Sequence, residues 1–162
     1  MASKEFTVAK TVLPTTSTAT EEIDLSAYVD PGDNQGVEIL HVDYIWHNDS
    51  TKLPFSSGSD FQAAVQLKDN TAGGMIDYDD IHLVSSAGYS NDANVGGQYP
   101  GDVYPDTLPG MGRVVVNDQL EIAGDVSSTQ TNLACTVRVT MRIKKLTKRD
   151  WMQIALQTVA DN

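Results

Sequence analysis

Histidine and carboxylate side chains alternate in the stretch HVDYIWH, which runs from His41 to His47. Successive side chains of a β-strand point to opposite faces, so His41, Asp43, Ile45 and His47 share one face. Imidazole and carboxylate groups are zinc ligands, but the two histidines are six residues apart, about 20 Å along a strand. One ion could be shared by His41 and Asp43 but not by His47 as well. We therefore predict the solvated face of a sheet, with no metal site.

A second group of carboxylates, Asp77, Asp79 and Asp80, lies in IDYDD after two glycines. Three carboxylates in one loop can hold Ca²⁺, but the spacing lacks the positions of an EF-hand loop. An acidic surface loop is the favoured interpretation, and the sequence predicts no cofactor.

No pattern in the chain indicates catalysis. Cys135 is the only cysteine, and its neighbours at spacing two, Leu133 and Val137, predict a buried free thiol. No serine lies in a nucleophile-elbow context, and the glycines of GGQYPG precede neither a lysine nor a helix. We predict that the protein is not an enzyme.

Charge is distributed unevenly along the 162 residues, whose formal net charge is −11. Residues 1–137 hold five bases against 20 acids, a balance of −15, whereas residues 138–162 hold six bases against two acids, a balance of +4. An acidic body disfavours nonspecific nucleic-acid binding, while a local basic patch can meet an anionic partner, including the acidic body of another copy. The six bases, which we call the C-terminal basic residues, are Arg138, Arg142, Lys144, Lys145, Lys148 and Arg149.

The first of these bases lie in a predicted strand, LACTVRVTMRIKKL. Its alternation places Leu133, Cys135, Val137, Val139, Met141 and Ile143 on a core face and displays Thr136, Arg138, Thr140 and Arg142 on the other. Lysine and arginine at 148 and 149 oppose the dipole of a following helix, so helix stability does not explain them. The six C-terminal basic residues are predicted to contact a neighbouring subunit or another anionic partner. Pairing with the domain's own acids is the alternative.

Alternation of apolar and polar residues dominates the rest of the chain. It predicts about eight antiparallel strands in a β-sandwich of jelly-roll type, with one domain over residues 1–162. The predicted strands lie in residues 5–13, 20–29, 37–48, 61–67, 81–86, 112–117, 119–124 and 133–146. Asn117-Asp118 is predicted to form a tight hairpin turn between two of them.

Residues 89–110 are rich in Gly, Pro, Asn and Asp and are predicted to form a long contact loop without strands. Tyr89, Tyr99 and Tyr104 could there stack on sugars. A monomeric module that binds carbohydrate or another surface ligand is therefore the alternative function.

In the last segment, after residue 146, the apolar residues no longer alternate but recur at helical spacing. Thr147 and Asp150 have capping-box spacing, and the apolar residues Trp151, Ile154, Ala155 and Val159 follow at helical spacing. We predict a short amphipathic helix over residues 147–160 that docks on this domain or on a neighbour, with Trp151 as an anchor.

Two features of the sequence bear on membrane insertion and secretion. No apolar run approaches the roughly 20 residues that span a bilayer, so no membrane span is predicted. MASKEF has no apolar core that would indicate a secretory signal.

A strand-rich chain with IDLSAYVDPGDNQGVEILHVDYIW and a terminal VRVTMRIKKLTKRDWMQIALQ resembles the small virion proteins of marine bacterial or archaeal viruses, in particular a single jelly-roll capsid subunit. The resemblance implies a shell protein, assembled in the host cytoplasm into a virion, that binds copies of itself and could also bind other virion proteins. Unlike many coat proteins, the chain starts with MASKEFTVAK and has no basic arm. Nucleic acid could therefore be contacted only through the C-terminal basic residues.

Overall fold

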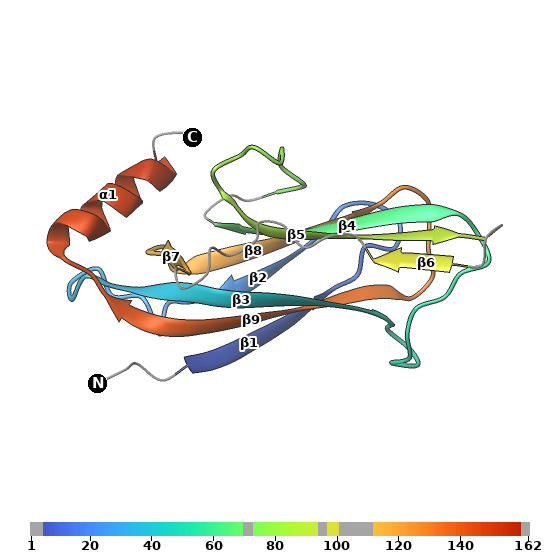
Figure 1. The fold of residues 1–162 in the computed structure, drawn as a ribbon, viewed down its shortest axis with the longest axis horizontal. Coiled ribbons are helices and arrows are strands. Elements are labelled where there is room, and N and C mark those ends of the chain that lie inside the picture. Colours follow the sequence, from blue (N-terminus) through green and yellow to red (C-terminus); the bar gives the residue numbers. More distant parts are fainter. Residues whose placement is uncertain (1–4, 70–72, 94–96, 101–111, 160–162) are drawn as a thin grey trace.

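The computed structural model describes residues 5–69, 73–93, 97–100 and 112–159, which form two antiparallel sheets packed face to face and one C-terminal helix (Figure 1). The elements are β1 (Glu5–Val12), β2 (Ala19–Asp24), β3 (Gln35–Asn48), β4 (Phe61–Asp69), β5 (Leu83–Asp92), β6 (Gly97–Pro100), β7 (Arg113–Val115), β8 (Gln119–Val126), β9 (Leu133–Lys145) and α1 (Lys148–Val159).

The strand order identifies a jelly roll. One sheet has the order β1-β9-β3-β7 and the other β2-β8-β4-β5-β6. The first four strands pair with later strands in nested fashion: β1 with β9, β2 with β8, β3 with β7 and β4 with β5. Successive pairs alternate between the two sheets, which is how a long hairpin rolls into a jelly roll. The predicted all-β sandwich is confirmed, and β6 is added at the edge beyond β5.

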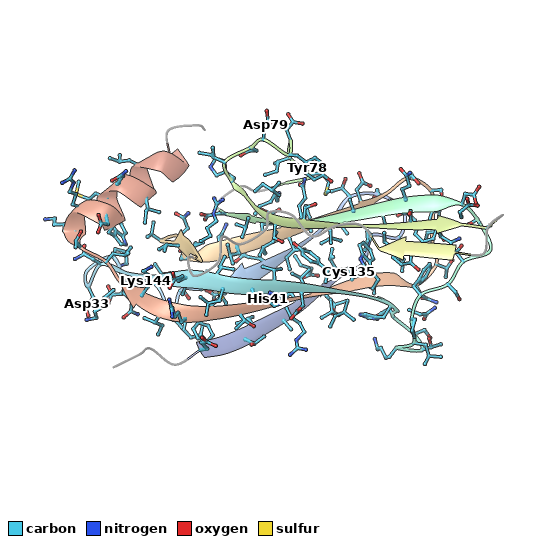
Figure 2. The ribbon with its side chains drawn as sticks, viewed as in Figure 1. Asp33, His41, Tyr78, Asp79, Cys135 and Lys144 are labelled. Carbon is cyan, nitrogen blue, oxygen red and sulfur yellow. The ribbon has the colours of Figure 1, made fainter. Side chains whose placement is uncertain are left out.

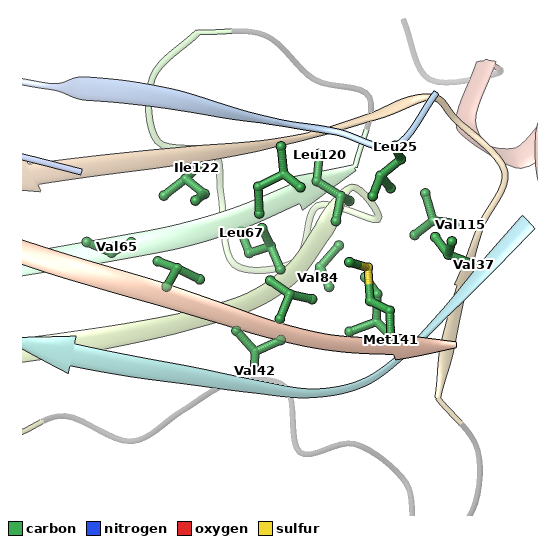
Figure 3. Packing of buried hydrophobic residues seen from close by; sticks show 14 of the residues in the cluster. Leu25, Val37, Val42, Val65, Leu67, Val84, Val115, Leu120, Ile122 and Met141 are labelled. Atoms are coloured by element: carbon green, nitrogen blue, oxygen red, sulfur yellow. The ribbon is translucent and has the colours of Figure 1, made fainter. Parts of the chain in front are cut away.

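The core lies between the sheets and follows the predicted alternation (Figure 3). Val137, Val139 and Met141 of β9 are fully buried, and they face residues such as Leu67 and Ile122 of the opposite sheet. A second cluster at one end of the sandwich is built on aromatic rings. Its buried members are Phe55, Phe61, Ala63, Tyr89 and Leu133.

Strand β3 changes the side on which its odd-numbered residues lie. Val37 and Ile39 are buried in the core, but beyond a register shift between Ile39 and His41 the core residue is Val42. A β-bulge inserts one unpaired residue and so inverts the alternation. The predicted outward face of His41, Asp43, Ile45 and His47 is confirmed, whereas the buried Glu38 near the start of the strand was not predicted.

The predicted hairpin at Asn117-Asp118 is wrong. β7 pairs with β3 in one sheet, whereas β8 pairs with β2 and β4 in the other, so this turn crosses between the sheets. Alternation alone does not say whether a turn joins neighbours in one sheet or crosses the sandwich. Here the Asn117 amide donates a 2.7 Å hydrogen bond to the buried carboxylate of Asp69, which fixes the crossing.

Two glycines allow β7 to lie close against β3. A Cβ atom on Gly112 would collide with the carbonyl oxygen of Ile39, and one on Gly36 would lie 2.6 Å from the carbonyl oxygen of Val115. Only glycine permits this approach of one backbone to another.

The predicted strandless loop over residues 89–110 is wrong in part. Tyr89 to Asp92 complete β5, and β6 pairs with them as an edge strand. An edge strand tolerates proline, because its outer N–H groups need no partner, so Pro100 can end β6. Residues 101–110 lie outside the described residues.

The C-terminal helix begins as predicted. The Asp150 backbone N–H donates a 3.2 Å hydrogen bond to Thr147 Oγ1, which in turn donates to the Asp150 carboxylate at 2.8 Å. The helix leaves the end of the sandwich and stands off the two sheets (Figure 1). No helix in the described part of the chain is long and apolar enough to cross a membrane.

Candidate functional site

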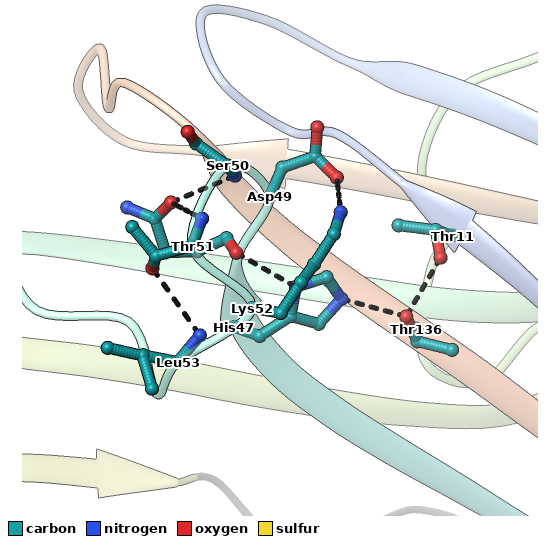
Figure 4. Close-up of polar contacts among 9 residues, drawn as sticks. Thr11, His47, Asp49, Ser50, Thr51, Lys52, Leu53 and Thr136 are labelled. Carbon is teal, nitrogen blue, oxygen red and sulfur yellow. Dashed lines mark hydrogen bonds and ion pairs between the residues drawn. The ribbon is translucent and has the colours of Figure 1, made fainter.

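The outer face of the four-stranded sheet carries the histidines of β3. His41 Nε2 lies 2.8 Å from Asp43 Oδ1, and both side chains are exposed. His47 instead lies 2.8 Å from Thr136 Oγ1, which is also hydrogen-bonded to Thr11 across β9, as Figure 4 shows. The predicted solvated sheet face is confirmed. In the ranges that the structure describes, no three His, Cys, Asp or Glu side chains gather into a group that could hold a metal ion.

Two of the C-terminal basic residues are held within the domain by Glu38. This carboxylate is 2% exposed, and it accepts hydrogen bonds from Arg142 Nε at 2.6 Å and Lys144 Nζ at 2.9 Å. Burial raises the pKa of Glu38, but the hydrogen bonds and charges of Arg142 and Lys144 outweigh it and leave the pKa below its ordinary value. For these two bases, pairing within the domain is the structural role.

The remaining four C-terminal basic residues form fewer ion pairs within the domain. Lys145 forms an exposed ion pair with Asp33 at 3.4 Å, and Figure 2 shows Asp33 at the same end of the sandwich as Lys144. Arg138 is exposed in the middle of β9, and Lys148 and Arg149 are exposed at the start of α1. None of these last three forms an ion pair with another side chain that the structure describes. The basic surface that is free for a partner is therefore smaller than the sequence predicts.

Of the three tyrosines predicted as loop contacts, only Tyr89 has a described side chain, and it does not lie in a loop. Tyr89 is a core residue, 6% exposed, whose ring packs beside Trp46 and Phe61 and whose hydroxyl donates to the Phe55 carbonyl at 3.0 Å. Its role as a sugar-stacking residue is wrong, because β5 continues through it. Tyr99 lies in β6 opposite Ser90, and Tyr104 lies outside the described residues.

The loop between β4 and β5, whose described residues are 73–82, is fixed by buried polar side chains that sequence reasoning missed. Gln66 forms two 2.8 Å hydrogen bonds with the backbone of Ile76. Lys68 is fully buried and donates to the carbonyl oxygens of Gly73 at 2.9 Å and Gly74 at 2.8 Å, with Glu121 at 3.7 Å. Burial lowers the pKa of Lys68, and Glu121 partly offsets that effect.

Arg113 holds the far end of the same loop. Its guanidinium donates to the carbonyl oxygen of Leu83 at 2.9 Å and to that of Ile81 at 2.5 Å. The β4–β5 loop is thus attached to the sheet at both ends. The alternation of β4 predicts solvent for Gln66 and Lys68, and no spacing in the sequence predicts that a loop covers them.

The acidic group lies on this loop. Asp77 and Asp79 are exposed, and Figure 2 shows Asp79 at its crest. Asp80 instead accepts 2.8 Å hydrogen bonds from the backbone N–H of His82 and from its ring, which lower the Asp80 pKa. The three carboxylates therefore do not converge on one point.

Cys135 is fully buried on the core face of β9, as predicted. Burial raises the pKa of its thiol, so the thiol is neutral at physiological pH. A neutral, inaccessible thiol does not serve as a nucleophile.

Helix α1 carries apolar side chains that the domain does not cover. Met152 is 49% exposed and Leu156 64% exposed, and they lie one turn apart on the same face. Trp151 is half-buried beside a cavity of about 370 Å³, and its indole Nε1 is buried without an acceptor among the described residues. The cavity is lined by Ser26, Val29, Pro31, Val116, Asn117, Asp118 and Trp151. The predicted anchor thus rests on its own domain, while its neighbours on the helix face outward.

No protein-family model matches this chain, and no curated protein matches it either.

Proposed function

We propose that this protein is a structural subunit of a virion shell, which assembles through contacts between copies of itself. The observation that carries the proposal is the uncovered apolar face of α1. A helix of 12 residues is marginal in water by itself, and Met152 and Leu156 are left to solvent in the single chain. A second copy that covers this face would supply the missing packing.

Charge favours a second copy over other partners. The start of α1 carries the exposed bases Lys148 and Arg149, while residues 1–137 have a balance of −15. If the start of α1 in one subunit contacts the acidic body of the next, Lys148 and Arg149 lie against carboxylates of opposite charge. A repulsive acidic surface makes nucleic acid a poorer partner for the whole domain.

The jelly-roll fold is compatible with a shell protein, but the fold alone does not distinguish this function from others. Jelly rolls form viral capsids, but they also form lectin domains and cupins. The resemblance of the sequence to small virion proteins favours the first of these. A shell of this kind assembles in the host cytoplasm, with other virion proteins as further neighbours.

The experiment changes only the uncovered helix face. In Met152→Ser/Leu156→Ser we expect subunit contacts to weaken by about 3 kcal/mol, roughly a hundredfold in dissociation constant, because two apolar side chains lose their burial. Sedimentation velocity should then show small species where the wild type forms large ones. Truncation before Thr147 should have the same effect.

The matched control is Leu53→Ser in the loop after β3, where Leu53 is 64% exposed, as Leu156 is. This variant should assemble like the wild type, and both serine variants should keep the wild-type circular dichroism, whereas the truncation should lose only the signal of α1. Unchanged assembly of the helix variant would refute the proposed role of α1.

A further inference from the structure

A shallow groove lies on the outer face of the five-stranded sheet. It consists of two depressions of about 450 and 470 Å³, and they are continuous because Gln62, Ser90 and Ser127 line both. Volumes of this size lie within the range of small-molecule sites. The groove is open along its length, which suits a linear chain of rings better than one enclosed ligand.

One wall of the groove is formed by an aromatic side chain on a loop whose backbone is attached to the sheet. Tyr78 lines the first depression and is 59% exposed. It belongs to the β4–β5 loop, which Gln66, Lys68 and Arg113 attach to the sheet. Figure 2 shows Tyr78 below the crest of this loop, on the outer side of the sheet.

Small residues at the bottom of the groove and polar residues along its edge could accommodate a flat polar ring. Ala64 and Gly88 line the floor and leave room above the sheet. The Asp125 carboxylate accepts hydrogen bonds from Thr18 at 3.3 Å and from the Val126 backbone at 2.8 Å, so each of its oxygens has one lone pair without a donor among the described residues. The exposed Gln62 adds both donors and an acceptor.

The charge of the groove restricts the ligand. Asp60, Asp92 and Asp125 line its two depressions, and no lysine or arginine does so among the described residues. Carboxylates repel sulfated and uronic chains but accept hydrogen bonds from sugar hydroxyls.

From these observations we propose that the groove binds a neutral linear oligosaccharide, with one sugar ring stacked on Tyr78 and its hydroxyls bonded to Asp125 and Gln62. This activity is separate from shell assembly, since it uses the sheet face and not α1. In a virion it would serve attachment to a glycan-bearing surface.

The test is a titration of the full chain with cellotetraose, chitotetraose and mannotetraose at millimolar concentration, followed by calorimetry and by the amide NMR shifts of Gly88 and Ser90. We expect at least one tetrasaccharide to bind and to shift these amides, and dextran sulfate not to bind. Tyr78→Ala should raise the dissociation constant about tenfold through loss of the ring contact. Ala64→Arg should block the floor and abolish binding.

Ile81→Ala is the matched control, because Ile81 lies on the same loop, is 45% exposed and does not line the groove. It should bind like the wild type, and all of these variants should retain wild-type assembly. The proposal is overturned by no binding of any of the three sugars, by equal binding to Tyr78→Ala, or by a preference for dextran sulfate.

Discussion

Lys68→Met is expected to lower the free energy of unfolding by about 3 kcal/mol, because it leaves buried acceptors without a donor. Lys68 is fully buried and donates to two backbone carbonyl oxygens of the β4–β5 loop, with the Glu121 carboxylate nearby. Methionine has nearly the same volume as lysine, so the packing is kept. The loss of stability then reports only the missing charge and hydrogen bonds. For a domain of this length the melting temperature should fall by roughly 6–12 °C.

The control for this change is Lys10→Met. Lys10 pairs with Glu21 at 3.3 Å on the surface, where both side chains are more than 40% exposed. An exposed pair contributes at most about 1 kcal/mol, so the control should melt close to the wild type. Equal melting temperatures for Lys68→Met and the wild type would show that the loop is not held by this side chain.

Glu38→Gln should cost about 2 kcal/mol at neutral pH. The carboxylate is 2% exposed and accepts two charge-assisted hydrogen bonds, from Arg142 and Lys144. Both bases are about 40% exposed at their side chains and regain water when the carboxylate is lost, which keeps the cost below that of a fully buried pair.

The same pair predicts a pH dependence with a definite sign. The pKa of Glu38 is lowered in the folded state, so its stabilisation is present above the ordinary glutamate pKa and is lost as pH falls through the lowered folded value. Denaturant unfolding between pH 7 and pH 3 should therefore show the wild type and Glu38→Gln converging in acid. Glu21→Gln, in the exposed pair, provides the control. A difference that stays constant over this range would contradict the ion pair.

Strand alternation was sufficient to predict an all-β sandwich, since the core of a sandwich is formed by every second residue of each strand, but it did not predict every connection between the strands. It predicted the buried face of β9 and the outward histidines of β3. It did not predict the bulge before His41, because one extra residue leaves no mark in the composition of a strand. The burial of Glu38 was not predicted either, because it depends on the pairing of β3 with β9, which brings Arg142 and Lys144 beside the carboxylate.

The candidate sites were predicted less well than the strands. Local signals were reliable where the interaction is local, as in the Thr147–Asp150 cap. Tyr89 was misplaced because the glycine and asparagine content around it favours a loop, whereas packing against Trp46 and Phe61 makes it a core residue. The groove combines residues 60–64, 78, 88–92 and 125–127, which only the sheet brings together.

The central claim is that this chain assembles with copies of itself. The most direct measurement is the mass distribution of the purified protein by light scattering, with negative-stain imaging, at low and at high salt. We predict regular particles or rings that loosen as salt rises, because exposed opposite charges are screened. A 17.5 kDa monomer at both salt concentrations would contradict the claim.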